Sequence, residues 1–226
     1  MEYPENVNET STAVRQVPQR KRKPQARHEI TKRAVEDAAE ELFIKHGFGG
    51  ATIDQIAKQA GVTKGGLYFC FADKECLLLR LLERADEMVL DPMLESVGGM
   101  LQDPLEALDE YVYWWARVAV SEWRKLLLPI LISLEFLNLD NAPAAHLRKR
   151  YEKLYGLVSS LIRSGQKKGV FRTEEKPEEL AMVLVAITDG MLLEWLRHGM
   201  RIDGRSLVQT LRRTLFFGMV VNTKQD

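Results

Sequence analysis

The sequence has few cysteines, no excess of charge of either sign and no long hydrophobic run. The 226 residues contain two cysteines, Cys70 and Cys76. They are too few for a disulfide framework and lack the spacing of a zinc site, so we expect a reducing compartment, the cytoplasm. Lysine plus arginine and aspartate plus glutamate number 32 each, which gives a net charge of zero. This balance excludes a chain coated in positive charge but allows a local basic patch.

The chain also lacks the sequence signals of a membrane protein or an enzyme. Its richest apolar run, 181–187, is far shorter than the roughly 20 residues of a membrane span. No apolar stretch follows the N-terminal charges, so we expect no signal peptide. The histidines His28, His46, His146 and His198 show no catalytic or metal-binding spacing, and neither a phosphate loop nor G-x-S-x-G occurs. We therefore predict no enzyme activity, no cofactor, no metal and no membrane partner.

Apolar residues recur at helical spacing from His28 onward, without sustained period-two alternation. This pattern predicts an all-α fold of about nine helices. Residues 1–27 are polar and aperiodic, so we expect a disordered tail with a basic second half. Gly47 ends the first predicted helix, and helix starts are expected at Thr52, Thr63 and Asp73. Further helices are expected over about 103–119, 122–139 with a bend near Pro129, 143–165, 177–199 and 203–220.

Two short helices around Gly61 form a candidate helix-turn-helix, because a sharp reversal between packed helices favours glycine. The second helix, about 63–69, carries hydroxyl, ammonium and glycine groups that suit a DNA major groove. By itself this pattern is weak, since many helical proteins contain two short helices around a glycine.

Residues 28–82 resemble the DNA-binding domain of the TetR family of bacterial transcription regulators. The segment AAEELFIKHGFGGATIDQIAKQAGVTKGGLYFCFADKECLL carries LF-x-x-x-GF, then T-x-x-x-IA-x-x-AGV-T-x-G-x-LY, then F-x-x-KE-x-L. Cys70 stands where many members have histidine, which leaves one DNA contact open. The resemblance implies a motif over 52–71 whose DNA-facing residues are Thr52, Thr63, Lys64, Gly65, Gly66, Tyr68, Phe69 and Lys74, the last on a phosphate.

The resemblance further divides the chain into a DNA-binding domain, 28–88, and an effector-binding and dimerisation domain, 89–226. It implies a ligand pocket among helices four to eight, although core filling is the ordinary role of an aromatic residue. Candidate pocket residues, several from the aromatic-rich stretch after Asp103, are Met88, Tyr111, Trp114, Trp115, Trp123 and Phe136.

The last two predicted helices are apolar on more than one side, so a second subunit is expected to cover the outer side. The resemblance implies a four-helix dimer interface there. Its candidate residues are Met182, Val185, Ile187, Leu211, Leu215 and Phe217.

We therefore expect a homodimeric, ligand-responsive repressor that binds a palindromic operator in double-stranded DNA and is released by a small hydrophobic effector. Half-sites would lie about 34–36 Å apart. Repression rather than activation rests on the resemblance. The alternatives are a helical adaptor that binds only proteins, which would not need the surface from Thr63 to Lys74, and a small-molecule enzyme.

Overall fold

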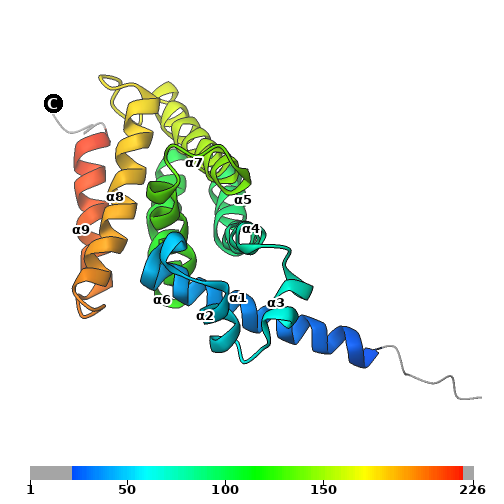
Figure 1. Ribbon diagram of the computed structural model, residues 1–226. Helices are drawn as coiled ribbons and strands as arrows, with labels where there is room; N and C mark the ends of the chain where they lie inside the picture. Colours follow the sequence, from blue (N-terminus) through cyan, green and yellow to red (C-terminus); the bar gives the residue numbers. More distant parts are fainter. Residues whose placement is uncertain (1–21, 221–226) are drawn as a thin grey trace, which may run out of the picture.

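The computed structural model describes residues 22–220, and within that range the regular structure is helical (Figure 1). The prediction of an all-α fold with about nine helices is confirmed. The elements are α1 (Arg22–Gly50), α2 (Ile53–Gln59), α3 (Lys64–Cys70), α4 (Lys74–Ala85), the π-helix η1 (Asp86–Leu90), α5 (Asp91–Gly99), α6 (Pro104–Glu135), α7 (Ala142–Lys167), α8 (Pro177–Arg197) and α9 (Gly204–Met219).

Local side-chain caps set most helix starts as the sequence predicts. Thr52 and Gln55 form a reciprocal capping box at α2, and the Thr63 hydroxyl accepts the Gly66 N–H at α3. Asp73 and Asp103 cap α4 and α6 in the same way. Gly61, between α2 and α3, has φ +67°, a conformation that a residue with a Cβ rarely adopts.

Two helix boundaries differ from prediction. The first helix begins at Arg22, whereas we expected a disordered tail through residue 27, because Gln and Ala favour a helix and Pro24 is tolerated in its first turn. Residues 1–21 of that tail lie outside the described range. The fourth predicted helix ends at Ala85 and continues as the π-helix. The kink of α6 lies at Glu122 (φ −128°, ψ 28°), where the predicted helices 103–119 and 122–139 meet, and Pro129 lies inside the helix that follows.

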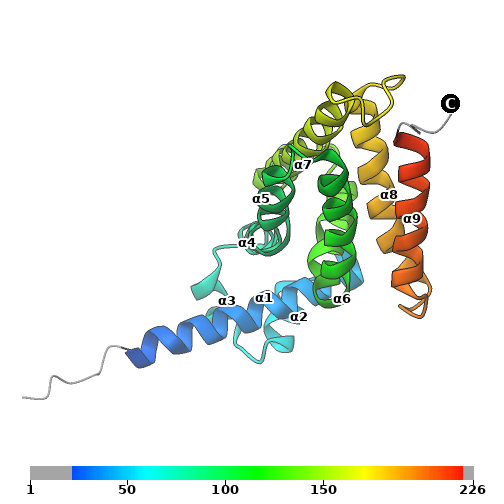
Figure 2. The same ribbon diagram turned by 180° about the vertical axis from the view of Figure 1, so that it is seen from behind.

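The helices form two groups that meet at α1, α4 and α6 (Figures 1 and 2). One core joins α1–α4 to the end of α6, around Phe43, Ile56 and Leu77. A second core joins α5–α9 around Met93, Tyr111 and Leu184. Helices α8 and α9 lie at the side of the molecule away from the free end of α1 (Figure 1).

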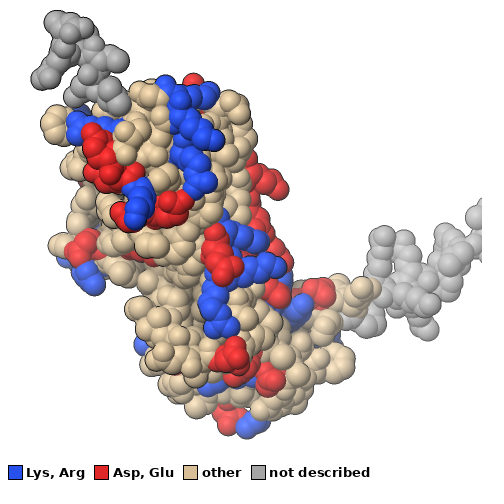
Figure 3. Space-filling model, turned by 90° about the horizontal axis from the view of Figure 1, so that it is seen from above, with Lys and Arg blue, Asp and Glu red and all other residues tan. Residues whose placement is uncertain are grey.

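The surface carries both signs of charge. On the face opposite the α1–α3 end, basic and acidic side chains are interspersed, as the zero net charge suggests (Figure 3). None of the helices within residues 22–220 combines the length and apolar character that a membrane crossing requires.

Candidate DNA-binding surface and effector cavity

Helices α2 and α3 form a compact helix-turn-helix on the core of α1 and α4. Ile56, Ala57, Leu67 and Phe71 are buried in that core, and Ile53 and Val62 pack against it. Their burial fixes α3 and leaves its other face outward.

The outward face of α3 carries large side chains in solvent. Phe69 is 80% exposed and Tyr68 46% exposed, although apolar side chains of this size are usually covered. Lys64 is exposed and pairs with Asp54 of α2 at 3.0 Å, which raises the pKa of its ammonium group. Thr52, Thr63 and Gly65 are also exposed, and Gly66 is half-buried. All predicted DNA-facing residues except Lys74 therefore reach solvent. Some of them also cap helices or form this ion pair, and the Phe69 ring meets the His28 ring edge to face, with centroids 5.3 Å apart.

The contacts that Lys74 makes in the structure are not those of its predicted role as a phosphate contact. Its Nζ donates to the carbonyl oxygens of Phe48 (2.8 Å) and Ala51 (3.0 Å), and it lies 4.3 Å from the centroid of the Phe48 ring. The ammonium thus has one donor left. In this structure Lys74 holds the turn between α1 and α2.

Glu135, at the end of α6, holds the same turn from the other side. Its carboxylate oxygens accept the N–H groups of Phe48 (2.8 Å) and Gly49 (2.7 Å), across 87 and 86 residues of sequence. Gly47, with φ +73°, allows the chain to turn there. Sequence analysis missed Glu135, since a single glutamate at a helix end carries no motif. Helix α6 is therefore bonded directly to the helix-turn-helix domain.

A cavity of about 690 Å³ lies among α6, α7, α8 and α9. This volume is in the range of small-molecule sites. Aromatic rings from three helices line it, together with aliphatic side chains and a few polar groups. The aromatic lining residues are Tyr113, Trp115, Tyr151 and Trp195.

Of the six predicted pocket residues, Trp115 is the one that lines this cavity. Tyr111 is fully buried, with its hydroxyl 3.3 Å from Thr188 Oγ1, and burial raises its pKa. Phe136 packs in the other core, with its ring centroid 5.2 Å from that of Phe48. Met88, Trp114 and Trp123 are also absent from the lining: Met88 is exposed, and the two tryptophans pack beside the α5–α9 cores. A 32-residue helix carries aromatic residues into several environments, so their density along the sequence did not locate the cavity.

Two charged side chains in the cavity lining are withdrawn from solvent, Arg150 fully and Asp189 partly. Asp189 of α8 lies among apolar groups, and desolvation raises the pKa of its carboxyl group to about 6. Arg150 of α7 is buried, and desolvation lowers its pKa to about 10, so it keeps its charge at pH 7. The sequence signal was an acid at position 189, two residues after the apolar run 181–187 and before further apolar residues.

Arg150 connects the cavity to the end of α4. Its guanidinium contacts the carboxylate of Asp86, the first residue of the π-helix. Asp86 Oδ2 also lies 2.9 Å from His146 Nε2, and desolvation lowers the pKa of His146, which favours its neutral form. The π-helix, a rare element often found at functional sites, is thereby fixed from α7.

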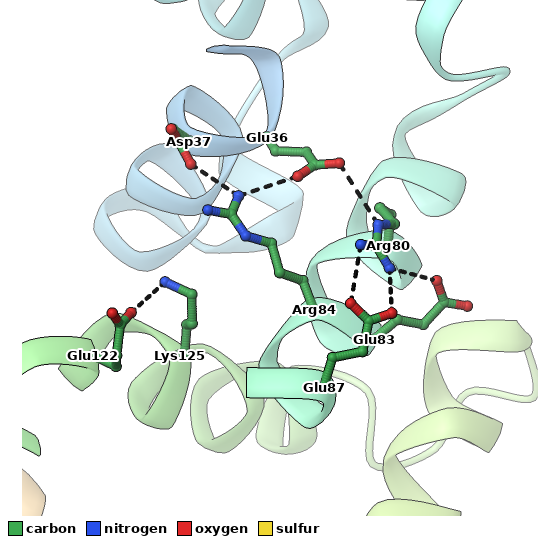
Figure 4. Close-up of polar contacts among 8 residues, drawn as sticks. All are labelled: Glu36, Asp37, Arg80, Glu83, Arg84, Glu87, Glu122 and Lys125. Carbon is green, nitrogen blue, oxygen red and sulfur yellow. Dashed lines mark hydrogen bonds and ion pairs between the residues drawn. The ribbon is translucent and has the colours of Figure 1, made fainter. Parts of the chain in front are cut away.

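A second polar junction joins α1 and α4 next to an ion pair of α6 (Figure 4). Arg84 of α4 donates to Glu36 (3.1 Å) and Asp37 (2.9 Å) of α1, and Arg80 pairs with Glu87 (2.8 Å). On α6, the buried Lys125 pairs at 2.6 Å with Glu122, the residue at the kink. The kink of α6, beside the cavity wall at Leu126, thus lies at the junction with the DNA-binding domain.

The predicted dimer residues fall into two groups. Met182 and Phe217 are 57% and 77% exposed, as an outer face requires. Val185 and Leu215 are buried in the chain's own core, and Ile187 and Leu211 are half-buried. The outer faces of α8 and α9 therefore carry fewer apolar groups than the sequence runs suggested, because half of each run turns inward.

The cysteines show no sign of paired chemistry. Both are free, and burial raises the pKa of the Cys70 thiol, which makes it less reactive. No three His, Cys, Asp or Glu side chains within residues 22–220 gather as metal ligands would.

Known proteins match both parts of the chain. Residues 36–81 match the profile of the bacterial regulatory proteins of the tetR family, and residues 138–216 match the C-terminal profile of BetI-type transcriptional repressors. The transcriptional repressor BepR of Brucella suis is 27% identical over 86% of this chain and 96% of its own length. The regulator AcrR of Shigella flexneri is 32% identical over 49% of this chain and 52% of its own. The crystal structure of the MbdR regulator from Azoarcus sp. CIB superposes with a TM-score of 0.74 at 32% identity, covering 84% of this chain and all of that one.

Proposed function

The chain belongs to the TetR family of bacterial transcription regulators, and on that premise we propose how its parts act. It is a ligand-responsive DNA-binding repressor that acts as a dimer on operator DNA. The domain boundary falls in the π-helix, near residue 88, with DNA binding before it and effector binding and dimerisation after it. The chain works in the cytoplasm, where its DNA is, and catalyses no reaction.

Helix α3 enters the major groove in our proposal. The observation that supports it most is the exposure of Tyr68 and Phe69 on a helix whose other side is buried. Two aromatic side chains held in solvent by a rigid motif are stable partners for base edges and sugar carbons. Lys64 and Thr63 add donors for phosphates, Thr52 can contribute once its hydroxyl leaves Gln55, and Gly65 and Gly66 let the helix backbone approach. Lys74 acts indirectly, by holding the turn before α2.

The cavity between α6 and α9 binds the effector, a small and largely apolar molecule. Its volume, its aromatic lining and its two buried charges support this assignment. Trp115 is the aromatic residue for which sequence and cavity agree.

Two contacts carry the effect of the ligand to DNA. A ligand that displaces Arg150 moves its partner Asp86, and with it the end of α4. A ligand that presses on Pro129 or Ile130 moves the end of α6, whose Glu135 holds the α1–α2 turn. Either movement changes the position of α3 relative to the α3 helix of the second subunit. The ligand releases DNA only if it binds the released conformation more tightly than the DNA-bound one.

A joint titration tests this proposal. An operator is first recovered by selection from fragmented genomic DNA, and apolar compounds are then screened for a change in tryptophan fluorescence. We expect each binding compound to lower operator affinity over the same concentration range in which fluorescence changes. Trp115→Ala should weaken that response and leave ligand-free operator binding intact. Ligand binding without any change in operator affinity would refute the coupling.

A further inference from the structure

One acid in the effector cavity has no partner of its own. Asp189 lies on α8 within the cavity wall, and among residues 22–220 it makes neither a hydrogen bond nor an ion pair. Arg150 is close enough to act on it electrostatically but contacts Asp86 instead. A half-buried carboxylate that is left without a partner is costly for a fold.

The basic groups of the cavity wall are differently placed. The guanidinium of Arg150 is buried against Asp86, and that of Arg117 is exposed and donates to Glu110 at 2.7 Å. Arg205 lies in solvent at the start of α9. An anionic ligand would therefore have to break one of these ion pairs or bind at the solvent-exposed edge of the cavity. A cationic ligand would find the carboxylate of Asp189 without a partner among residues 22–220.

The rings that line the cavity favour the same ligand. Tyr113, Trp115, Tyr151 and Trp195 come from α6, α7 and α8. The faces of tyrosine and tryptophan rings attract organic cations, most strongly where water is excluded. Of the two acids in the lining, Asp203 caps α9, and Asp189 combines charge neutralisation with the apolar contact that the four aromatic rings offer.

We infer that the effector is a lipophilic cation, an apolar organic molecule with an ammonium or phosphonium group, and that Asp189 is its counter-ion. This inference rests on the proposed effector cavity. It adds the chemical class of the ligand and the residue that selects it.

The binding of such a cation depends on pH. The raised pKa of Asp189, about 6, means that the carboxyl group is ionised at pH 7.5 and mostly protonated at pH 5.0. The affinity for a permanent cation should therefore fall about tenfold between these values. The other titratable or charged groups that face the cavity or Asp189 are Tyr111, Tyr113 and Arg117 of α6, Arg150, Tyr151 and Tyr155 of α7, and Asp203 and Arg205 near the start of α9. Of these, Asp203 has its carboxylate exposed and caps α9, so Asp189 is the acid that titrates inside the cavity.

Two ions of equal shape and opposite charge provide the test. Tetraphenylphosphonium and tetraphenylborate are titrated into the full-length dimer, and binding is measured by tryptophan fluorescence and calorimetry at pH 7.5 and 5.0. At pH 7.5 we expect the phosphonium to bind at least ten times more tightly than the borate. Asp189→Asn should abolish both the preference and its dependence on pH. Asp140→Asn, which removes the same charge from an exposed acid outside the cavity wall, should keep them.

The inference is overturned if the phosphonium does not bind, if the borate binds as tightly, or if Asp189→Asn keeps the preference. Operator binding, measured in the same samples, separates this inference from the proposed function. A phosphonium that binds through Asp189 without lowering operator affinity would support the ligand class and refute the release mechanism.

Discussion

The contact between Glu135 and the α1–α2 turn allows a sharp prediction, because it joins the two domains through two measurable hydrogen bonds. The carboxylate accepts the N–H groups of Phe48 and Gly49 at 2.8 and 2.7 Å. Hydrogen bonds to a charged group contribute about 1.5–3 kcal/mol each when buried, and these two lie at the surface. We therefore expect Glu135→Ala to cost about 2 kcal/mol of local stability.

That loss should appear first at the turn itself. An opening free energy lower by about 2 kcal/mol corresponds to roughly thirtyfold faster amide exchange at Phe48 and Gly49. Because the turn leads into α2, operator affinity should also fall, by about tenfold. Hydrogen exchange read by NMR or mass spectrometry measures the first effect, and fluorescence anisotropy on the operator measures the second. Glu152→Ala, which removes an exposed glutamate from α7, is the control. Unchanged exchange at residues 48 and 49 would refute the reasoning.

Three further changes test other parts of the structure. Lys64→Ala should weaken binding to all DNA sequences and flatten the plot of log affinity against log salt by about one per subunit, and an unchanged slope would remove Lys64 from the phosphate contacts. Asp189→Asn should raise the free energy of unfolding at pH 7.5 by up to about 3 kcal/mol, because the raised pKa of Asp189 means that its ionised form destabilises the fold. As pH falls through about 6 towards 4, Asp189 is protonated and the stability of the native protein should approach that of the variant. Melting temperatures that still differ at pH 4 would contradict this. Arg150→Met should destabilise the fold by about 3–5 kcal/mol by leaving Asp86 buried without its guanidinium. The double variant Arg150→Met, Asp86→Leu should regain stability but not the effector response, and a normal response would exclude this route.

The sequence allowed the prediction of those features that depend on residues close to one another along the chain. The capping box of Thr52 and Gln55, the cap at Thr63 and the turn at Gly61 act within a few residues, and the structure contains all three.

Contacts between distant segments could not be predicted. Lys74 and Glu135 hold the same turn from α4 and α6, yet no periodicity connects them. The aromatic residues on and just after α6 show the same limit, since Trp115 lies in the cavity wall and Phe136, the residue that caps the helix, packs in the DNA-binding core. Helical spacing defines a face, but which element covers that face depends on the tertiary fold.

The most direct test of the central claim, that α3 reads an operator, is the specificity ratio of Tyr68→Ala. Affinity is measured by anisotropy for the selected operator and for a scrambled duplex of the same length at one salt concentration. Tyr68 is largely outside the core, so the variant should melt at the temperature of the native dimer. We predict that its affinity for the scrambled duplex is kept while its affinity for the operator falls by tenfold or more, so that the ratio of the two drops. An unchanged ratio in the folded variant would contradict the assignment of α3 as the recognition helix.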